Sequence, residues 1–168
     1  MSEQTEIAEL KATIAEFVRA LTKLELNLTE AQAIIRGLYA VAEGDRFNME
    51  AFVSAFSDDG YMTDIPAGVT LRGKAIGDYI GALTTAFPDI RRELFHIYVA
   101  GNVVVVELAI RGTHRGDLPL PLGTLAPTGR AIDIPCCDVF RLENGKVASF
   151  HCYNAASVMQ QQLGKVSS

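Results

Sequence analysis

The sequence predicts an α+β domain in which helices come first and a curved antiparallel sheet follows. In the first half, apolar residues recur at steps of three and four, which is typical of amphipathic helices. After Pro88, apolar and polar residues alternate between Gly-Asn and Asn-Gly turns, which is typical of β-hairpins. The chain has 168 residues, which fits one such domain whose helices cover one face of the sheet.

The first segment carries one narrow apolar stripe and predicts an amphipathic helix over residues 7–28. Such a stripe usually packs against the core of its own domain, but three heptads also suit a dimer arm or a lid. Thr29 and Gln32 form a capping-box pattern, which predicts that a second helix begins there and ends at Gly44. The stripe consists of Ile7, Leu10, Ile14, Phe17, Leu21, Leu24 and Leu28.

The remaining elements follow from local periodicity and from turn residues. Helices are predicted over Met49–Phe56, Lys74–Phe87 and Ala155–Leu163, and a short extended piece over Tyr61–Ile65. Strands are predicted over Ile90–Ala100, Val103–Thr113, Ala131–Leu142 and Lys146–Tyr153, with a loop at Arg115–Gly129.

Composition excludes several classes of function. The net charge is −5, from 20 acidic and 15 basic residues without any run of five like charges, so neither nucleic acid nor an anionic membrane is an expected partner. The odd number of cysteines, three, without CxxC spacing predicts a reducing compartment. The N-terminus lacks signal-peptide features and the longest apolar run, Val103–Val106, is too short to cross a bilayer. The expected location is cytoplasmic.

Eight short motifs lie at or near the ends of the predicted elements. They are Gly44-Asp45, Ser57-Asp58-Asp59 with Asp64-Ile65-Pro66, Arg72-Gly73-Lys74, Phe87-Pro88-Asp89, Gly112-Thr113-His114, Pro127-Thr128-Gly129-Arg130, Asn144-Gly145-Lys146 and Gln162-Leu163-Gly164. In this order they resemble the SnoaL-like polyketide cyclases and, more distantly, the ketosteroid isomerases and limonene epoxide hydrolases of the nuclear-transport-factor-two fold.

The resemblance covers residues 32 to 164 and implies a cone-shaped domain, in which a curved antiparallel sheet wraps around helices. It also implies an interior pocket for a small, largely apolar organic molecule, and a homodimer. On this basis residues 1–28 are expected to form an N-terminal helical extension and residues 29–168 the SnoaL-like domain. The fold alone does not define a reaction, since it hosts many activities.

Asp64 is the first candidate for chemistry. It ends the short extended piece just before Pro66, where the resemblance to ketosteroid isomerases places the general base. A base that removes a proton next to a carbonyl group has to be shielded from water, and a pocket wall provides that shielding. The alternative is that Asp64 caps the turn at residues 66–68.

Asp138 is the second candidate, because it interrupts the apolar strand Ile134–Leu142. An aspartate in the middle of a strand is disfavoured and needs a partner. By resemblance it matches the oxyanion-hole carboxyl of the isomerases, which apolar surroundings keep protonated. The alternative is a buried aspartate paired with an arginine or a backbone amide.

The turn at Asn144-Gly145 decides which residues share a face with Asp138. A two-residue turn would bring His151 beside Asp138, whereas a three-residue loop, Glu143–Gly145, gives a different register. The resemblance favours the longer loop. The residues then predicted on one side of the sheet are Cys136, Asp138, Phe150 and Cys152.

Three positions depart from the relatives' patterns. Cys152 stands where the cyclases and epoxide hydrolases carry an essential Asp, and a thiol does not replace a carboxylate in acid-base chemistry near neutral pH. Arg36 stands where the isomerases carry their oxyanion Tyr. Glu107 stands close to the position of the hydrolases' Arg-x-Asp strand motif.

The remaining candidates are residues expected to line the pocket. No histidine has metal-ligand spacing, and there is no phosphate loop or dinucleotide fingerprint, so neither a metal nor another cofactor is expected. Among the histidines, His96 is the pocket candidate because it shares a strand face with Leu94 and Tyr98, and the alternative is a core histidine whose hydrogen bonds are satisfied. The predicted lining residues are Arg36, Tyr39, Tyr61, His96, Tyr98, Glu107, Cys136, Phe150 and Cys152.

The leading functional hypothesis is a cofactor-free isomerase or cyclase that acts on a small apolar, carbonyl-bearing molecule of polyketide or terpenoid type. In it, Asp64 transfers the proton and Asp138 polarises an oxygen. One alternative is a non-catalytic protein that binds a small ligand or a partner chain in the same pocket. Another is an epoxide hydrolase with water activated by Asp64 or Glu107.

Overall fold

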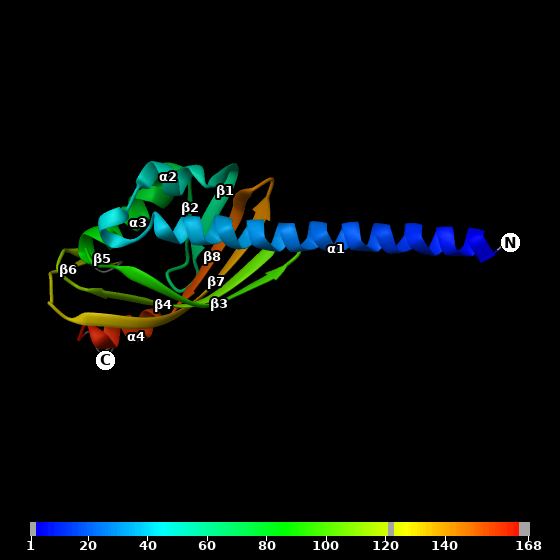
Figure 1. Cartoon of the computed structure of the whole chain (residues 1–168). Helices are drawn as coiled ribbons and strands as arrows, with labels where there is room; N and C mark the ends of the chain where they lie inside the picture. The colour runs from blue at the N-terminus through cyan, green and yellow to red at the C-terminus, as the bar shows by residue number, and fades with distance from the viewer. Residues whose placement is uncertain (1–2, 121–122, 165–168) are drawn as a thin grey trace.

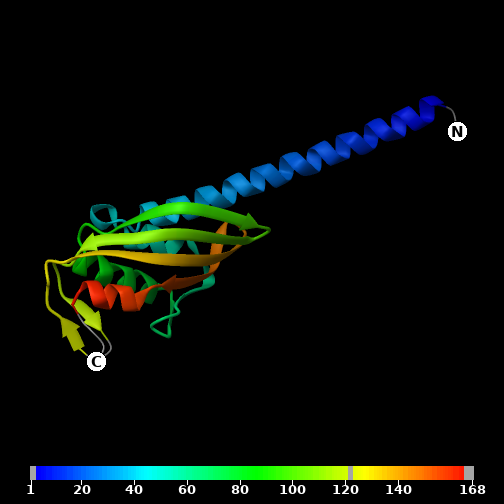
Figure 2. The same ribbon diagram turned by 90° about the horizontal axis from the view of Figure 1, so that it is seen from below.

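Six strands form one curved sheet that wraps around helices from the first half of the chain (Figures 1 and 2). The computed structural model describes residues 3–120 and 123–164. The spatial order of the strands is β2-β1-β8-β7-β4-β3. Their bounds are β1 Phe56–Asp64, β2 Val69–Arg72, β3 Arg91–Ala100, β4 Val103–Thr113, β7 Ala131–Glu143 and β8 Lys146–Asn154. The predicted α+β fold is confirmed.

The first helix is one continuous element, which corrects the predicted break at Thr29. The Oγ1 atom of Thr29 donates to the backbone carbonyl of Glu25 at 3.0 Å, one helical turn earlier, and therefore does not cap a new helix. The helices are α1 Glu3–Ala40, the 3-10 turn η1 Gly44–Arg46, α2 Met49–Ser54, α3 Lys74–Ala86 and α4 Ala156–Gln162.

The two halves of α1 have different surroundings. From Ala31 onward the helix packs into the sheet, and Ile35, Leu38 and Tyr39 are buried. Residues 4–27 are all exposed, and this part of α1 projects past the end of the sheet (Figure 1). The expectation that the N-terminal stripe packs against the core of its own domain is therefore wrong. The change falls at residue 28, which lies inside α1 and is half-buried.

The strands β3, β4, β7 and β8 form the predicted antiparallel meander. The sheet as a whole is mixed, because β1 lies parallel to β8. On its other edge β1 pairs with β2, a short and mostly exposed edge strand that the sequence did not predict. Inside the segment predicted as a loop, β5 Leu118–Leu120 pairs with β6 Gly123–Leu125. Residues 121 and 122 of that segment lie outside the described residues.

The last hairpin combines a two-residue turn with a β-bulge. Asn144 and Gly145 both have positive φ, 50° and 73°, and join Glu143 to Lys146, so the predicted three-residue loop is wrong. The pairing then shifts by one residue beyond Leu142, and Asp138 lies opposite Cys152. The bulge therefore produces the facing pattern that was predicted for the longer loop.

A second bulge lies in β3. Leu94 pairs with Leu108, but the next pair is His96 with Glu107, so Phe95 is an extra residue. Because one inserted residue reverses the alternation of faces, Leu94 points towards the core while His96 is exposed.

Candidate active site

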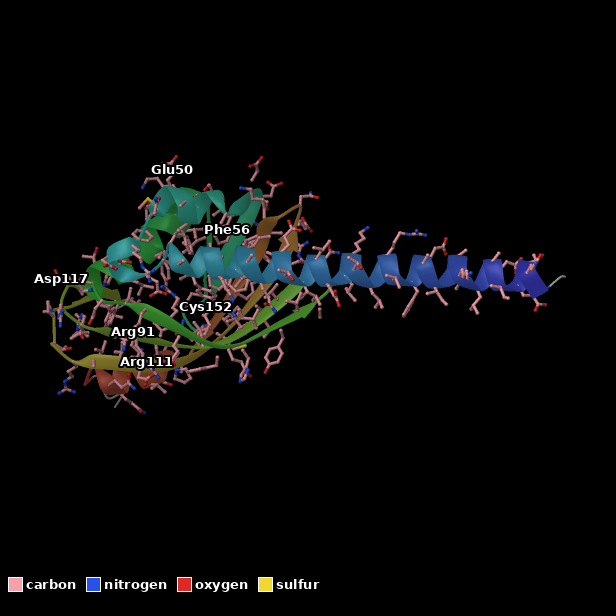
Figure 3. All side chains as sticks on the ribbon, viewed as in Figure 1. Glu50, Phe56, Arg91, Arg111, Asp117 and Cys152 are labelled. Carbon is pink, nitrogen blue, oxygen red and sulfur yellow. The ribbon has the colours of Figure 1, made fainter. Side chains whose placement is uncertain are left out.

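The sheet, the C-terminal half of α1 and α3 enclose a cavity of about 370 Å³, with α4 and β5 contributing residues to its wall. This volume suits a small organic ligand. Figure 3 shows Cys152, one of its lining residues, in the interior between α1 and the sheet. The apolar lining includes Leu38, Phe52, Met62, Ile80, Leu83, Phe87, Ile90, Ile110, Ile132, Ile134 and Phe150. The polar lining includes Tyr39, Asp64, Tyr79, Arg92, Asp138, Cys152, Asn154 and Gln160.

Asp138 lies at the inner wall of the cavity and is only 2% exposed. The Tyr39 hydroxyl donates to its Oδ2 atom at 2.6 Å, and the Cys136 thiol donates to its Oδ1 atom at 3.2 Å. Burial raises the pKa of Asp138, and the hydrogen bonds from Tyr39 and the thiols, together with the nearby Arg92 cation, only partly offset this rise. The site therefore favours a protonated carboxyl group.

The neighbours of Asp138 are also held in their neutral forms. Burial and the adjacent carboxyl raise the pKa of Tyr39. The hydrogen bond with Cys152, followed by burial, raises the pKa of Cys136. Tyr39 thus remains a hydroxyl donor near neutral pH, and the Cys136 thiol is not activated as a nucleophile.

One group of three potential metal ligands occurs among the described residues, formed by Cys136, Asp138 and Cys152. Their ligand atoms lie within 4.8 Å of one another, and the two Sγ atoms are 3.7 Å apart. A thiophilic ion would need both thiols deprotonated. The raised pKa of Cys136 opposes this, so the donor set is a poor fit for a resident metal.

Asp64 ends β1, lines the same cavity and is 7% exposed. It pairs with Cys152 of β8, which in turn pairs with Asp138 of β7. Its Oδ2 atom accepts hydrogen bonds from the Tyr79 hydroxyl at 2.7 Å and from Asn154 Nδ2 at 3.2 Å. Its Oδ1 atom accepts from the backbone N–H of Ala67 at 3.1 Å. Asp64 therefore lines the cavity and also caps the turn, so its capping role does not remove it from the cavity wall.

Tyr79 and Asn154 are the partners of Asp64 that sequence reasoning did not assign to the site. Burial and the hydrogen bond to Asp64 raise the pKa of Tyr79, which keeps its hydroxyl protonated. Asn154 lies two residues after Cys152 on β8, so strand alternation places both on the same face. That alternation was the available signal for Asn154.

Arg92 is a further cavity residue that was not predicted. Its Nη1 atom donates to the carbonyl of Ala42 at 2.8 Å, and its backbone N–H contacts both carboxylate oxygens of Glu43. Burial raises the pKa of Glu43. These contacts tie β3 to the end of α1 and fix a cation at the cavity wall. Arg92 lies two residues before Leu94 on β3, ahead of the bulge, so strand alternation was the available signal that it faces the cavity.

The structure brings together only part of the predicted lining. Tyr39, Phe150 and Cys152 line the cavity together with the two aspartates. Cys136 is buried beside Asp138 on β7 and its thiol donates to Asp138. The other five predicted lining residues, Arg36, Tyr61, His96, Tyr98 and Glu107, lie outside the cavity lining.

Helix and strand geometry explain why these five residues lie outside the cavity lining. Arg36 is exposed because the buried stripe of α1 runs through Ile35 and Leu38, away from position 36. Tyr61 alternates with the inward Met62, and its ring lies 5.7 Å from that of His151 on the outer face.

The remaining three residues, His96, Tyr98 and Glu107, lie together on the outer face of the sheet. Glu107 alternates with the buried Val106, and the β3 bulge turns His96 outward opposite it. Tyr98 is exposed and its hydroxyl donates to Glu107 at 3.4 Å. Glu107 therefore does not reach a ligand in the cavity.

A family model described as the SnoaL-like domain matches residues 35–150. This is more than half of the chain, and the chain therefore belongs to the SnoaL-like domain family. The resemblance inferred from its motifs is confirmed. No curated protein sequence matches the chain. Among the described residues, no helix is long and apolar enough to cross a membrane.

Solved structures share the fold at low sequence identity. A proposed SnoaL-like polyketide cyclase from a Jannaschia species has a TM-score of 0.71 and 18% identity, over 83% of this chain and 94% of that chain. AclR from Streptomyces galilaeus, a proposed hydroxylase, has a TM-score of 0.70 and 18% identity, over 83% of this chain and 88% of that chain. A protein from Catenulispora acidiphila with a ketosteroid isomerase-like fold, in complex with trimethylamine, has a TM-score of 0.64 and 21% identity. The match covers 78% of this chain and 92% of that chain.

Proposed function

We propose that this protein is a cofactor-free isomerase or cyclase that acts on a small, mostly apolar molecule with a carbonyl group. The observation that carries the proposal is that Asp64 and Asp138 line one apolar cavity in two different environments. A pair of carboxyl groups in unlike surroundings is the arrangement that divides acid and base roles.

Asp138 is assigned to the substrate carbonyl oxygen. Its burial favours the protonated form, and a protonated carboxyl donates a hydrogen bond. The Cys136 thiol has the Cys152 sulfur as a second partner at 3.7 Å, so it can release Oδ1 of Asp138 for this contact. Tyr39 holds Oδ2 and keeps the carboxyl oriented.

Asp64 is assigned to proton transfer. Its three partners all donate hydrogen bonds, so its oxygens act as acceptors at the cavity wall. It takes the proton from the carbon next to the carbonyl group, and the electron pair moves to the carbonyl oxygen, where Asp138 stabilises it. The proton then returns to another carbon in an isomerase. In a cyclase the enolate carbon attacks a second carbonyl of the same molecule.

Proton abstraction is testable without knowledge of the natural substrate. Small cyclic ketones, including β,γ-unsaturated ones, are incubated with the protein in D₂O, and NMR follows the loss of the proton next to the carbonyl. Asp64→Asn is expected to slow exchange about 100-fold or more, and Asp138→Asn about tenfold or more. Asp78→Asn, an exposed change on α3, is the matched control and should exchange like the wild type.

A second candidate is a binding protein that performs no reaction. It is favoured by Cys152, which stands where the related cyclases and epoxide hydrolases carry an Asp. Ligand-detected NMR on the same ketones separates the two candidates. Binding with no exchange in the wild type contradicts catalysis and supports the binding role, whereas exchange that survives in both Asn variants contradicts the assignment of Asp64 and Asp138.

A further inference from the structure

The exposed half of α1 carries a regular apolar seam. Ile7, Ile14, Leu21 and Leu28 are spaced by seven, and Leu10, Phe17 and Leu24 follow three residues later in each repeat. A sustained 3.5-residue repeat is the pattern of a left-handed coiled coil. The six seam residues from Ile7 to Leu24 are between 45% and 64% exposed.

An isolated helix with such a seam lacks the packing that stabilises most helices. The arm, defined here as residues 4–28, is about 37 Å long and makes no contact with the sheet over most of that length (Figures 1 and 2). Helices in water gain most of their stability from burial of an apolar face. The seam therefore needs a partner surface that repeats with the same period.

We propose that the arm pairs with the arm of a second copy of this chain in an antiparallel two-helix coiled coil. A second copy offers the same repeat, so six of the seven apolar layers of one arm, from Leu10 to Leu28, each face a layer of the other. This inference does not depend on the proposed function of the cavity.

The direction follows from how α1 enters its domain. The seam continues into Ala31, Ile35 and Leu38, which are buried, and there α1 packs against β3 of its own chain. In a parallel pair, both sheets would have to occupy the space between the two helices. In an antiparallel pair the arms overlap and the two domains lie at opposite ends.

Charge supports the same direction. When Leu10 packs beside Leu28 of the second copy, Lys11 of one arm lies next to Glu25 of the other. The two-fold symmetry produces this pair twice. A parallel, in-register pair would instead place Glu6 next to Lys11.

The principal test compares two leucines on one helical turn. Leu24 lies on the seam and is 53% exposed, whereas Leu26 lies off the seam and is 65% exposed. Sedimentation equilibrium of the full chain is expected to show a dimer for the wild type and for Leu26→Asp. Leu24→Asp should weaken dimerisation at least 100-fold. Thermal unfolding of the domain should be unchanged in both variants, which excludes misfolding as the cause.

Charge reversal then tests the direction. Lys11→Glu should weaken the dimer about threefold, and adding Glu25→Lys should restore it, because each surface ion pair has a small effect. A monomeric wild type, or an unchanged dimer in Leu24→Asp, would overturn the arm as the interface. Restoration by Glu6→Lys in place of Glu25→Lys would overturn the antiparallel arrangement.

Discussion

The two aspartates of the cavity differ in what surrounds them more than in how exposed they are. Asp138 is enclosed by a phenol and two thiols on the inner wall, and burial raises its pKa. Asp64 ends a strand, where a phenol, a carboxamide and a backbone N–H hold its oxygens. The comparison shows that two carboxyl groups on one apolar wall differ in their hydrogen-bond partners, and that at Asp138 burial outweighs the effect of those partners on the pKa.

Removing the tyrosine hydroxyl that donates to each aspartate sharpens this comparison, and the larger loss of stability is expected at Asp138. Tyr39→Phe leaves Oδ2 of a fully buried carboxyl without its donor, and should lower the free energy of unfolding by about 1–3 kcal/mol. Tyr79→Phe leaves Asp64 with Asn154 and Ala67, and should cost about 0.5–1.5 kcal/mol. Urea denaturation measures both. Equal losses would contradict the stronger dependence of Asp138 on its single phenol.

The pH dependence of stability gives a second contrast. The folded-state pKa of Asp138 is raised above its unfolded value, so the folded state binds more protons than the unfolded state between the two values. The contribution of Asp138 is fully present below the unfolded pKa, near 3.9, and is lost as pH rises through the folded pKa.

Asp138→Asn removes this titrating group. The free energy of unfolding of the wild type minus that of the variant should therefore fall as pH rises above about 4. Parallel urea titrations of the two proteins across pH measure it. A difference that stays constant with pH would show that Asp138 has the same pKa in both states.

Sequence reasoning located both aspartates because their signals are local. Asp138 interrupts an apolar strand, and Asp64 lies in the Asp64-Ile65-Pro66 motif where the resemblance to ketosteroid isomerases places the general base, so each was recognised from a short stretch of sequence. Their partners were harder to find. Tyr79 comes from α3, fifteen residues from Asp64, and Asn154 is ninety residues away, so only the sheet and helix packing bring them together.

Two of the differences between prediction and structure arise where one extra residue in a strand changes which face the following side chains occupy. An extra residue at Phe95 reverses the facing of β3, and nothing in the alternation of that segment marks it. A bulge in β8 has the opposite outcome, since it restores the facing of Asp138 and Cys152 despite a shorter turn. At Thr29 the residues of a capping box are present, but the Thr29 hydroxyl donates to the carbonyl of Glu25, one turn earlier in the same continuous helix.

The smallest expected effect lies on the outer face of the sheet, and it tests whether inward facing is what makes a residue functional. His96 and Glu107 are paired across β3 and β4 and exposed to solvent. His96→Ala and Glu107→Gln should each change the free energy of unfolding by less than about 0.5 kcal/mol, as exposed substitutions usually do. They should also leave ketone proton exchange at the wild-type rate. A tenfold loss of exchange in Glu107→Gln would place a reacting group on the outer face and would contradict the assignment of chemistry to the cavity.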